Sequence, residues 1–496
     1  MFIDRQRELA FLDGLLSRAK TGSAQLCTVT GRRRTGKTEL LLHWANRIGV
    51  PYVYWAAVKE TPWQQRMRLS ARLFDEPLAS APVFQTWADL WEAAARDLAR
   101  NHRILILDNF PYVADADAGM VTALLSVWEK TFQGSDMVVI LCGAQQRSMQ
   151  ELLTEKSPLH GRVTAQLHVD PLPFAALQPF FPGWDVESRV GAFAISGGVP
   201  AYLAWLNPAL DLTANVQQVM LQPGSMFLSE PAYLLYDELR EHNNYLGILK
   251  AIGTEAHSLT AISERTSIPV TSTTFYLGVL QELRLVERRL SLLAGPPEPV
   301  RTRATAERGT VPRGAAARGG HPRSGRYYLN DPFFHFYMRF IEPYLADCPY
   351  RVEQVMEGYR VGLQNFIAEN TFPELALRWL ARQAEKGNTP FSPEVTGHFW
   401  NDRIDMPVVA VNWGTRDILL GDCKWRADPV DLLEVRALIE TKTRWVLQDL
   451  PAGGEGWRVH YAFFSRKGFL PPAYAQIQRV GGLAVNINTL DTGLSQ

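Results

Sequence analysis

One segment near the N-terminus has the residue types and the spacing of a phosphate-binding loop. It matches the pattern GxxxxGK[ST], follows an apolar run at residues 25–30 and precedes a helical pattern. The two glycines let the backbone curl so that its N–H groups face phosphate oxygens, and the helix start adds a partial positive charge. The predicted cofactor site consists of Gly31, Arg32, Arg33, Arg34, Thr35, Gly36, Lys37 and Thr38, with Glu39 directly after them.

Two residues of this loop have definite expected roles. Lys37 is expected to reach the β- and γ-phosphates, and Thr38 to offer its hydroxyl to Mg²⁺. The loop therefore predicts ATP as the ligand and Mg²⁺ as its metal ion.

An acidic residue at the end of a second apolar run is the candidate partner of that metal ion. Asp108 follows residues 103–107, which places its carboxylate beside the water shell of Mg²⁺. Many P-loop ATPases carry glutamate next, as the base that orients the attacking water, but Asn109 stands here. An amide can hold a water molecule but is a poor acceptor of its proton. Hydrolysis is expected to be slow, or to use Asp115 or Asp117, although solvated loop positions explain both acids more simply.

Two further polar residues are candidate sensors of the γ-phosphate. Gln145 follows the apolar run at residues 137–142, and Arg162 lies in the segment Ser157-Pro158-Leu159-His160-Gly161-Arg162. Arg162 has the residue type of an arginine finger. A loop glutamine and a surface arginine are the alternative interpretations.

A second constellation lies near the C-terminus and has the residue types of a metal-dependent nuclease. Asp405 and the pair Asp422 and Lys424 are expected at one edge of two adjacent strands. Two carboxylates can hold Mg²⁺, which activates water for attack on a phosphodiester, and Lys424 shares a strand face with Asp422. A preceding helix is expected to supply Glu374, with Glu369 as second choice. The alternative is a salt-bridged strand edge, Asp422 with Lys424 or Arg426, in an inactive domain.

The elements that must position these residues divide the chain into five parts. Residues 1–200 alternate helices (8–18, 84–99, 119–132) with continuous apolar strands (25–30, 52–55, 103–107, 137–142). That rhythm predicts the α/β fold of a P-loop domain, a parallel sheet with helices on both faces. Residues 361–496 predict a second αβ domain, with strands 404–411, 417–425 and 459–464 and a helix at 432–447.

The middle of the chain is predicted to be helical with one interruption. Residues 201–293 contain helices at 241–253, 260–266 and 271–283 and a strand at 286–292, the outline of a winged helix. The third helix opens on residues 271–276 and carries few cations, so DNA contact and plain packing both stay open. Phosphate contacts are offered near the wing by Arg284, Arg288 and Arg289.

Two segments between the winged helix and the C-terminal domain differ sharply in composition. Residues 294–325 hold six arginines against two glutamates with almost no large apolar residue, so a disordered insertion is expected. It is either a solvated linker or a flexible arm on phosphate backbone. Residues 326–360 predict an aromatic helical connector that packs in the core.

Composition bounds the protein class. At 496 residues about three domains are expected. The 51 basic and 51 acidic residues give no net charge, so the chain as a whole has no electrostatic attraction to nucleic acid. The four cysteines form no close pair, which fits a reducing cytoplasm, and Cys27 and Cys142 lie in apolar runs. The charged N-terminus has no signal core, and no apolar stretch is long enough for a membrane span. A cytoplasmic protein is predicted.

The order of these motifs resembles the archaeal-type P-loop ATPase family, within the AAA and signal-transducing ATPase group that carries a winged-helix module. The resembling segments are residues 2–9, 31–38, 107–112, 157–162, 197–200 and 330–334. The resemblance implies that Arg5–Glu8 lies near the nucleotide base and that a winged helix packs behind the ATPase core. It also implies a C-terminal PD-(D/E)XK domain, which is restriction-endonuclease-like. Asn109 and the arginine-rich insertion depart from the family pattern.

Two functions follow as hypotheses. The first is an ATPase whose nucleotide state controls a winged-helix and nuclease-like module acting on DNA. The second is an ATP-dependent signalling switch whose C-terminal domain only binds. No membrane partner is expected, whereas a homo-oligomer or a protein partner stays open.

Overall fold

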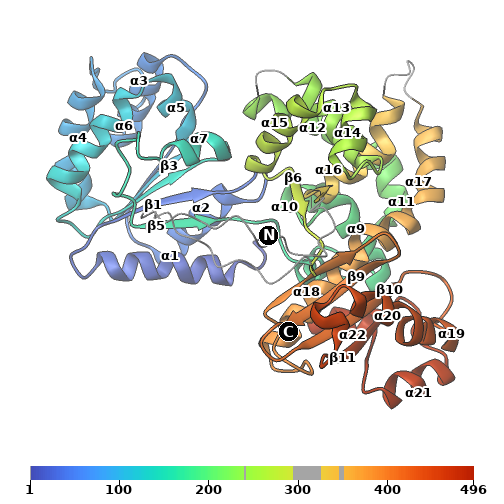
Figure 1. Cartoon of the computed structure of the whole chain (residues 1–496). Coiled ribbons are helices and arrows are strands. Elements are labelled where there is room, and N and C mark those ends of the chain that lie inside the picture. Colours follow the sequence, from blue (N-terminus) through green and yellow to red (C-terminus); the bar gives the residue numbers. More distant parts are fainter. Residues whose placement is uncertain (1, 240–241, 294–324, 346–350, 496) are drawn as a thin grey trace. The chain divides into compact units, whose positions relative to one another are not determined.

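The computed structural model describes residues 2–239, 242–293, 325–345 and 351–495 (Figure 1). The predicted insertion, apart from Gly325, and Cys348 lie outside these residues. The chain forms two compact units. Unit 1 contains Met1–Pro179, Gly198–Leu206 and Ser229–His242, and unit 2 contains Phe180–Gly197, Asn207–Leu228 and Asn243–Gln496.

Unit 1 is built on a five-stranded parallel sheet in the order β2-β3-β4-β1-β5. Strands β3 and β4 are buried at every position, as expected for central parallel strands. Four strands lie where the apolar runs predicted them, and the edge strand β5, which is short and half-polar, was missed. The strands are β1 (Gln25–Thr30), β2 (Tyr52–Ala56), β3 (Ile104–Asp108), β4 (Val138–Cys142) and β5 (Ala165–His168).

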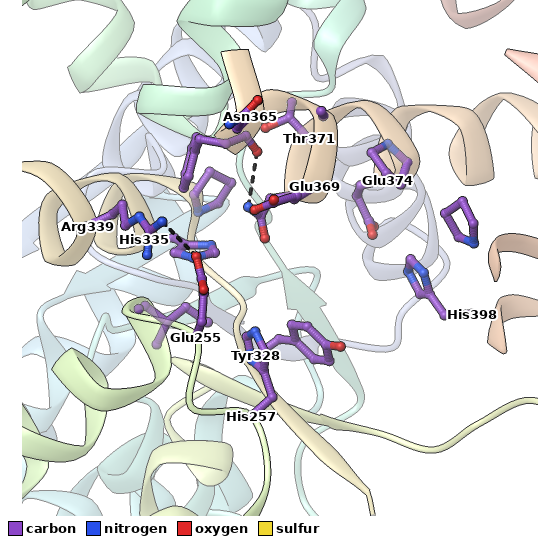
Figure 2. A pocket seen from close by; sticks show the side chains of 18 of the residues that line it. Glu255, His257, Tyr328, His335, Arg339, Asn365, Glu369, Thr371, Glu374 and His398 are labelled. Carbon is purple, nitrogen blue, oxygen red and sulfur yellow. Dashed lines mark hydrogen bonds and ion pairs between the residues drawn. The ribbon is translucent and has the colours of Figure 1, made fainter. Parts of the chain in front are cut away.

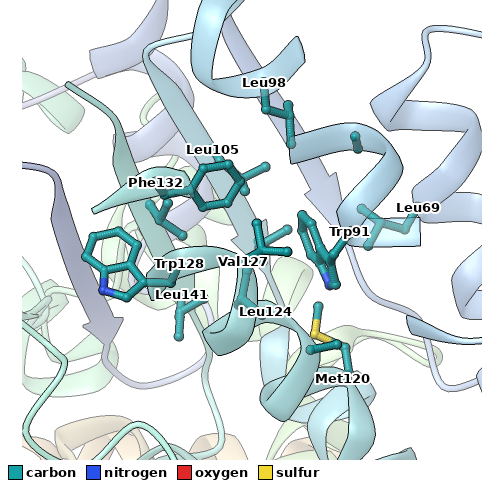
Figure 3. Close-up of a cluster of buried hydrophobic side chains, with 14 of the residues drawn as sticks. Leu69, Trp91, Leu98, Leu105, Met120, Leu124, Val127, Trp128, Phe132 and Leu141 are labelled. Carbon is teal, nitrogen blue, oxygen red and sulfur yellow. The ribbon is translucent and has the colours of Figure 1, made fainter. Parts of the chain in front are cut away.

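Helices cover both faces of this sheet, which confirms the predicted α/β class. On one face Leu12 and Trp44 pack with Cys27 and Ile106 of the strands. On the other face Trp91, Leu124 and Phe132 form the centre of a large apolar cluster (Figure 3). The helices are α1 (Gln6–Ala19), α2 (Lys37–Ile48), α3 (Pro62–Leu73), α4 (Trp87–Asn101), α5 (Phe110–Ala116), α6 (Gly119–Val127), the π-helix η1 (Trp128–Phe132) and α7 (Gln146–Glu151).

Several short helices follow β5. In unit 1, α10 (Pro200–Trp205) begins at a proline, and most of α12 (Met226–Glu238) belongs to the same unit. The others are η2 (Phe174–Ala176), α8 (Leu177–Phe180), α9 (Val186–Ser196), α11 (Leu212–Asn215) and η3 (Val216–Met220).

Unit 2 contains three helices and a strand in the region where the sequence predicted a winged helix, and β6 with its partner strand is called the wing. They are α13 (Asn243–Gly253), α14 (Leu259–Thr266), α15 (Val270–Glu282) and the strand β6 (Val286–Arg289). The partner of β6 is β7 (Arg326–Leu329), which pairs antiparallel from beyond the insertion with Val286 opposite Leu329. Residues 326–329 are therefore a strand and not the start of the helical connector, because pairing with β6 outweighs the aromatic context of a short run.

The remaining connector packs as a core of aromatic rings, as predicted. Phe336, Phe340, Tyr359 and Phe366 meet edge to face or tilted, and all are buried. Asp331 caps the first helix through the Phe334 N–H. The helices are α16 (Pro332–Phe336), η4 (Tyr337–Ile341), η5 (Glu342–Tyr344), α17 (Val352–Phe366), η6 (Ile367–Thr371) and α18 (Phe372–Glu385).

The C-terminal part of unit 2 is a mixed sheet in the order β12-β11-β10-β9-β8. Strands β8, β9 and β10 form an antiparallel meander, and β10, β11 and β12 are parallel. The strands are β8 (Val395–Trp400), β9 (Asp405–Asn412), β10 (Asp417–Lys424), β11 (Arg458–Ser465) and β12 (Leu483–Asn486). The helices are α19 (Leu432–Arg436), η7 (Ala437–Lys442), α20 (Thr443–Gln448), η8 (Pro451–Gly454), α21 (Pro471–Arg479) and α22 (Ile487–Ser495).

None of the helices in the described part of the chain combines the length and apolar character that crossing a bilayer requires.

Candidate functional site

The predicted phosphate-binding loop joins the end of β1 to the start of α2 in unit 1. Its backbone is left-handed at three positions, with φ of 145° at Gly31, 68° at Arg34 and 85° at Gly36. A Cβ at Gly31 would lie 2.4 Å from the carbonyl oxygen of Val169. Gly31 is therefore required both by its dihedral angle and by the neighbouring chain.

Lys37 closes the loop from inside. Its Nζ donates to the carbonyl oxygens of Gly31 and Arg32, both at 2.8 Å, and the side chain is only 7% exposed. The ammonium group is thus held over the loop by two neutral acceptors. A phosphate oxygen is a stronger, charge-assisted partner for the same group.

Thr38 and Asp108 meet as the sequence predicted. The Thr38 hydroxyl donates to Asp108 Oδ2 at 2.5 Å, and the Tyr54 hydroxyl donates to the same oxygen at 3.1 Å. Asp108 is 3% exposed, and burial together with its negative charge raises the pKa of Tyr54. A hydroxyl and a carboxylate at one point are hard oxygen donors, so this pair fits Mg²⁺.

The residues next to Asp108 hold structural positions. Asn109 is left-handed at φ 51° before α5, and its amide donates to the Ala57 carbonyl at 3.4 Å. Asp115 accepts from the Ser148 hydroxyl at 3.1 Å. Asp117 accepts from the Gly119 N–H at 2.9 Å and from the Trp87 indole. Neither acid contacts Thr38 or Asp108, so the simpler interpretation of both is favoured.

The other predicted site residues differ in how the structure places them. Gln145 is buried and follows β4, the strand that lies between β1 and β3, so it stands between the loop and Asp108 along the sheet edge. Arg162 pairs with Glu129 at 3.1 Å on the surface of unit 1. Arg33 and Glu39 are exposed. Gln145 thus lies at the sheet edge that carries the loop, whereas Arg162 does not meet the loop.

Two arginines of the loop are held by a carboxylate that sequence patterns did not indicate. Arg34 Nε lies 2.6 Å from Glu230 Oε1, and Glu230 of α12 is fully buried. The Tyr202 hydroxyl donates to Glu230 at 2.9 Å and accepts from Arg32 at 2.8 Å. Burial lowers the pKa of Arg32 and raises that of Tyr202. The guanidinium of Arg34 also lies 4.5 Å from the ring centre of Trp205.

Arg5, near the N-terminus, is hydrogen-bonded to the loop. Its guanidinium donates to the Thr35 carbonyl at 2.8 Å and pairs with Glu8 at 2.8 Å. Arg5 is 6% exposed and left-handed at φ 74°. The motif Asp4-Arg5-Gln6-Arg7-Glu8 was the only sequence signal for this contact, and for Tyr202 the only signal was the preceding Gly197-Gly198-Val199-Pro200.

The C-terminal candidates lie at one end of the mixed sheet in unit 2. The pairing of Gly421 with Val408 brings the start of β9, with Asp405, to the end of β10, with Asp422 and Lys424. Lys424 Nζ lies 3.2 Å from Asp422, as expected for one strand face. Lys442 approaches the same carboxylate at 3.3 Å.

The other two C-terminal acids pair with arginines. Asp405 lies 2.6 Å from Arg326, and Glu374 lies 3.5 Å from Arg289 and 3.6 Å from Arg378. Within the described residues, no three His, Cys, Asp or Glu side chains converge on a point that could hold a metal ion. The donor types fit Mg²⁺, but in this arrangement each acid is neutralised by a cation.

Two family models match the chain. Residues 2–206 match the model described as an ATPase domain predominantly from Archaea. The N-terminal part of the chain is thus similar to an ATPase domain of the archaeal type. Residues 337–437, which include Asp405, Asp422 and Lys424, match a family described as archaeal and bacterial proteins of unknown function.

Similar proteins come from archaea. The uncharacterized protein MJECL04 of Methanocaldococcus jannaschii is 26% identical over 431 residues, which is 86% of this chain and 88% of the relative. A Walker-type ATPase of Pyrococcus abyssi matches 68% of this chain and 96% of its own at 16% identity and a TM-score of 0.45. The Aeropyrum pernix ORC2 protein, solved as ADPNP–ADP complexes, matches 73% of this chain and 95% of its own chain, at 15% identity and a TM-score of 0.42.

Proposed function

We propose that the chain is an ATPase whose nucleotide state controls metal-dependent cleavage of DNA by its C-terminal domain. The observation that carries the nucleotide half is the meeting of Lys37, Thr38 and Asp108 at the carboxyl edge of the parallel sheet. Thr38 and Asp108 would hold Mg²⁺, which would offset negative charge on the phosphates.

The residues of the ATPase domain have distinct roles in this proposal. Lys37 exchanges two loop carbonyls for phosphate oxygens, and Thr38 and Asp108 orient the metal ion's shell. Gln145 contacts the γ-phosphate. Because Asn109 cannot accept a proton from water, the lifetime of the ATP state is long.

The nuclease half is supported by topology and by residue placement. Helix α18 precedes an antiparallel meander of three strands, followed by helices α19 and α20 and a parallel strand, an order typical of PD-(D/E)XK domains. Asp405, Asp422 and Lys424 lie at one end of that sheet. A bound metal ion there would activate water, and Lys424 would steady the negative charge of the attacked phosphate.

A second candidate function is a signalling switch whose C-terminal domain binds without cleaving. It is favoured by Asn109 and by the two lysines that neutralise Asp422. In this alternative the ion pairs at the sheet end are permanent, and ATP controls only which surface the chain presents to a partner.

Supercoiled plasmid incubated with the full chain and Mg²⁺, with and without ATP, separates the two functions. Cleavage should depend on ATP and disappear in Lys424→Ala. It should also be lost in Lys37→Ala, because that variant should lose most of its ATP affinity in calorimetry. Lys386→Ala, at an exposed lysine after α18, is the matched control. ATP binding with no cleavage of linear or supercoiled DNA would leave the signalling switch as the function.

A further inference from the structure

Unit 2 contains a partly open cavity of about 840 Å³, and most of its lining lies outside the predicted sites (Figure 2). Its walls come from the wing strands β6 and β7, the helices α16 to α18 and the first strands of the C-terminal sheet. The volume lies in the range of sites that enclose a small ligand or a segment of a larger one. Glu374 and Asp405, two of the candidate nuclease acids, line it.

The wing places two arginines in this cavity. Arg289 of β6 contacts Glu374 at 3.5 Å and His398 Nε2 at 3.0 Å, and it also pairs with Glu287. Arg326 of β7 lies 2.6 Å from Asp405. The two side chains are 28% and 32% exposed, so water reaches both from the cavity.

The segment that follows β6 is hydrogen-bonded to the C-terminal sheet. The Leu292 N–H donates to the His398 carbonyl at 2.9 Å. The Ser291 hydroxyl donates to the Trp400 carbonyl at 2.8 Å and accepts from the Trp400 N–H at 3.1 Å. Leu293 is buried in the apolar core of the C-terminal sheet. The wing is therefore attached to the edge strand β8, and its arginines are held beside the nuclease-like site.

One aromatic ring of the lining contacts both a histidine and one of these arginines. The Tyr328 ring stacks on His257 with centroids 4.5 Å apart and an interplanar angle of 25°. The guanidinium of Arg289 lies 4.6 Å from the centre of the same ring. If Arg289 turned toward a phosphate, the ring face that it covers would be free to stack on a base.

Most of the remaining charges of the lining are paired with each other. Glu255 is paired with Arg339 at 2.6 Å, and Glu374 also meets Arg378 at 3.6 Å. Glu369 is the other acid of the lining. Burial lowers the pKa of His335 to about 3 and that of His398 to about 4, so both are neutral at pH 7. The lining thus carries four arginines against five acids, so a ligand phosphate can bind there only by replacing a carboxylate beside an arginine.

We infer that this cavity binds a single strand of nucleic acid, whose phosphates replace Asp405 and Glu374 as the partners of Arg326 and Arg289. A cavity of about 840 Å³ is small for a duplex, whereas one strand or a strand end fits. The exchange is favourable because Asp405 is 58% exposed and exposed ion pairs contribute little. Strand binding also releases condensed counterions.

One consequence of strand binding rests on the proposed nuclease function. Phosphate binding would free Asp405 and Glu374 from their arginines only when a strand is present, so the acids become available to a metal ion on substrate alone. An empty site would keep its carboxylates neutralised. The substrate class of the nuclease-like domain is accordingly single-stranded nucleic acid or the ends of duplexes.

The test is binding without cleavage. Fluorescence anisotropy of a labelled twelve-residue oligothymidylate is measured with the full chain in EDTA, over a series of salt concentrations. Asp405→Asn should tighten binding by about two- to fivefold, because Arg326 loses the partner with which phosphate competes. Arg326→Gln should weaken binding and reduce the salt slope by about 0.7, the value of one lost phosphate contact on a single strand. The double variant should bind like Arg326→Gln.

Matched controls separate this result from a general loss of structure or charge. Arg458→Gln removes an arginine from an ion pair with Asp417 at the opposite end of the same sheet and should leave affinity unchanged. Glu374→Gln repeats the test through Arg289. Equal weakening in Arg326→Gln and Arg458→Gln, or no tightening in both acid variants, would overturn the inference. So would a duplex of the same length that binds as tightly as the strand.

The two proposals fail differently. Plasmid cleavage by a protein without affinity for the oligonucleotide would keep the proposed function and remove this inference. Binding with the expected variant pattern, but no cleavage in Mg²⁺, would keep the strand site and remove the nuclease.

Discussion

Replacing Glu230 by glutamine should destabilise the ATPase domain and make that domain more dependent on ATP. The side chain is fully buried, lies 2.6 Å from Arg34 and accepts from Tyr202, which in turn meets Arg32. Glutamine keeps the shape and the bond from Tyr202 but removes the negative charge that pairs with Arg34. Breaking a buried pair costs about 3–5 kcal/mol, and because Arg34 is 18% exposed we expect about 3 kcal/mol.

That loss corresponds to a measurable shift in melting temperature. For a domain of this size a change of 1 kcal/mol moves Tm by roughly 2–4 °C, so Glu230→Gln should lower Tm by about 6–12 °C. Phosphates of ATP would supply the missing negative charge, so the rise in Tm at saturating ATP should be larger in the variant than in the wild type.

Scanning calorimetry at one fixed scan rate measures both effects. The matched control is Glu151→Gln, an acid of the same unit whose pair with Arg147 is exposed, and its Tm should not change. A variant within about 1 °C of the wild type, or an equal response to ATP in both proteins, would show that Glu230 does not balance the loop arginines.

Two further predictions concern hydrolysis and pH. Asn109→Glu should raise the rate of phosphate release by about tenfold or more if a general base is what the site lacks, and an unchanged rate at saturating ATP would place the base elsewhere. The low pKa values of His335 and His398 mean that the unfolded chain binds more protons below pH 6.5, so stability is complete above that pH and is lost as pH falls toward 4. Tm should therefore fall between pH 7 and pH 5. This change of Tm with pH should become smaller when His335 and His398 are both replaced by glutamine, but it should persist in His160→Gln, a control at an exposed histidine. An equal change in the wild type and both variants would contradict the prediction.

The ATPase sheet and its site could be predicted because their signals are local. Continuous apolar runs marked β1 to β4, and the ends of parallel strands meet at one edge, which brought Asp108 to Thr38. The spacing from Gly31 to Thr38 required a loop between a strand and a helix. Strand β5 was missed because its four residues are half-polar.

The wing shows why other features could not be predicted. Residues 326–329 are too short a run to distinguish a strand from the aromatic helices after it. Their pairing with β6 joins segments on either side of the insertion, and no local pattern reports a contact of that kind. The role of Arg289 beside Glu374 depends on the same pairing.

The sequence by itself determined which groups can carry chemistry: the lysine and hydroxyl of the loop, the acids at strand ends and the arginines near the wing. Tertiary structure alone decided which charge neutralises which. Glu230 balances Arg34 from almost 200 positions away, and Asp405 meets Arg326 across the wing. The physical reason is that ion pairing depends on distance and burial in space, whereas sequence patterns report only what adjacent residues do along one element.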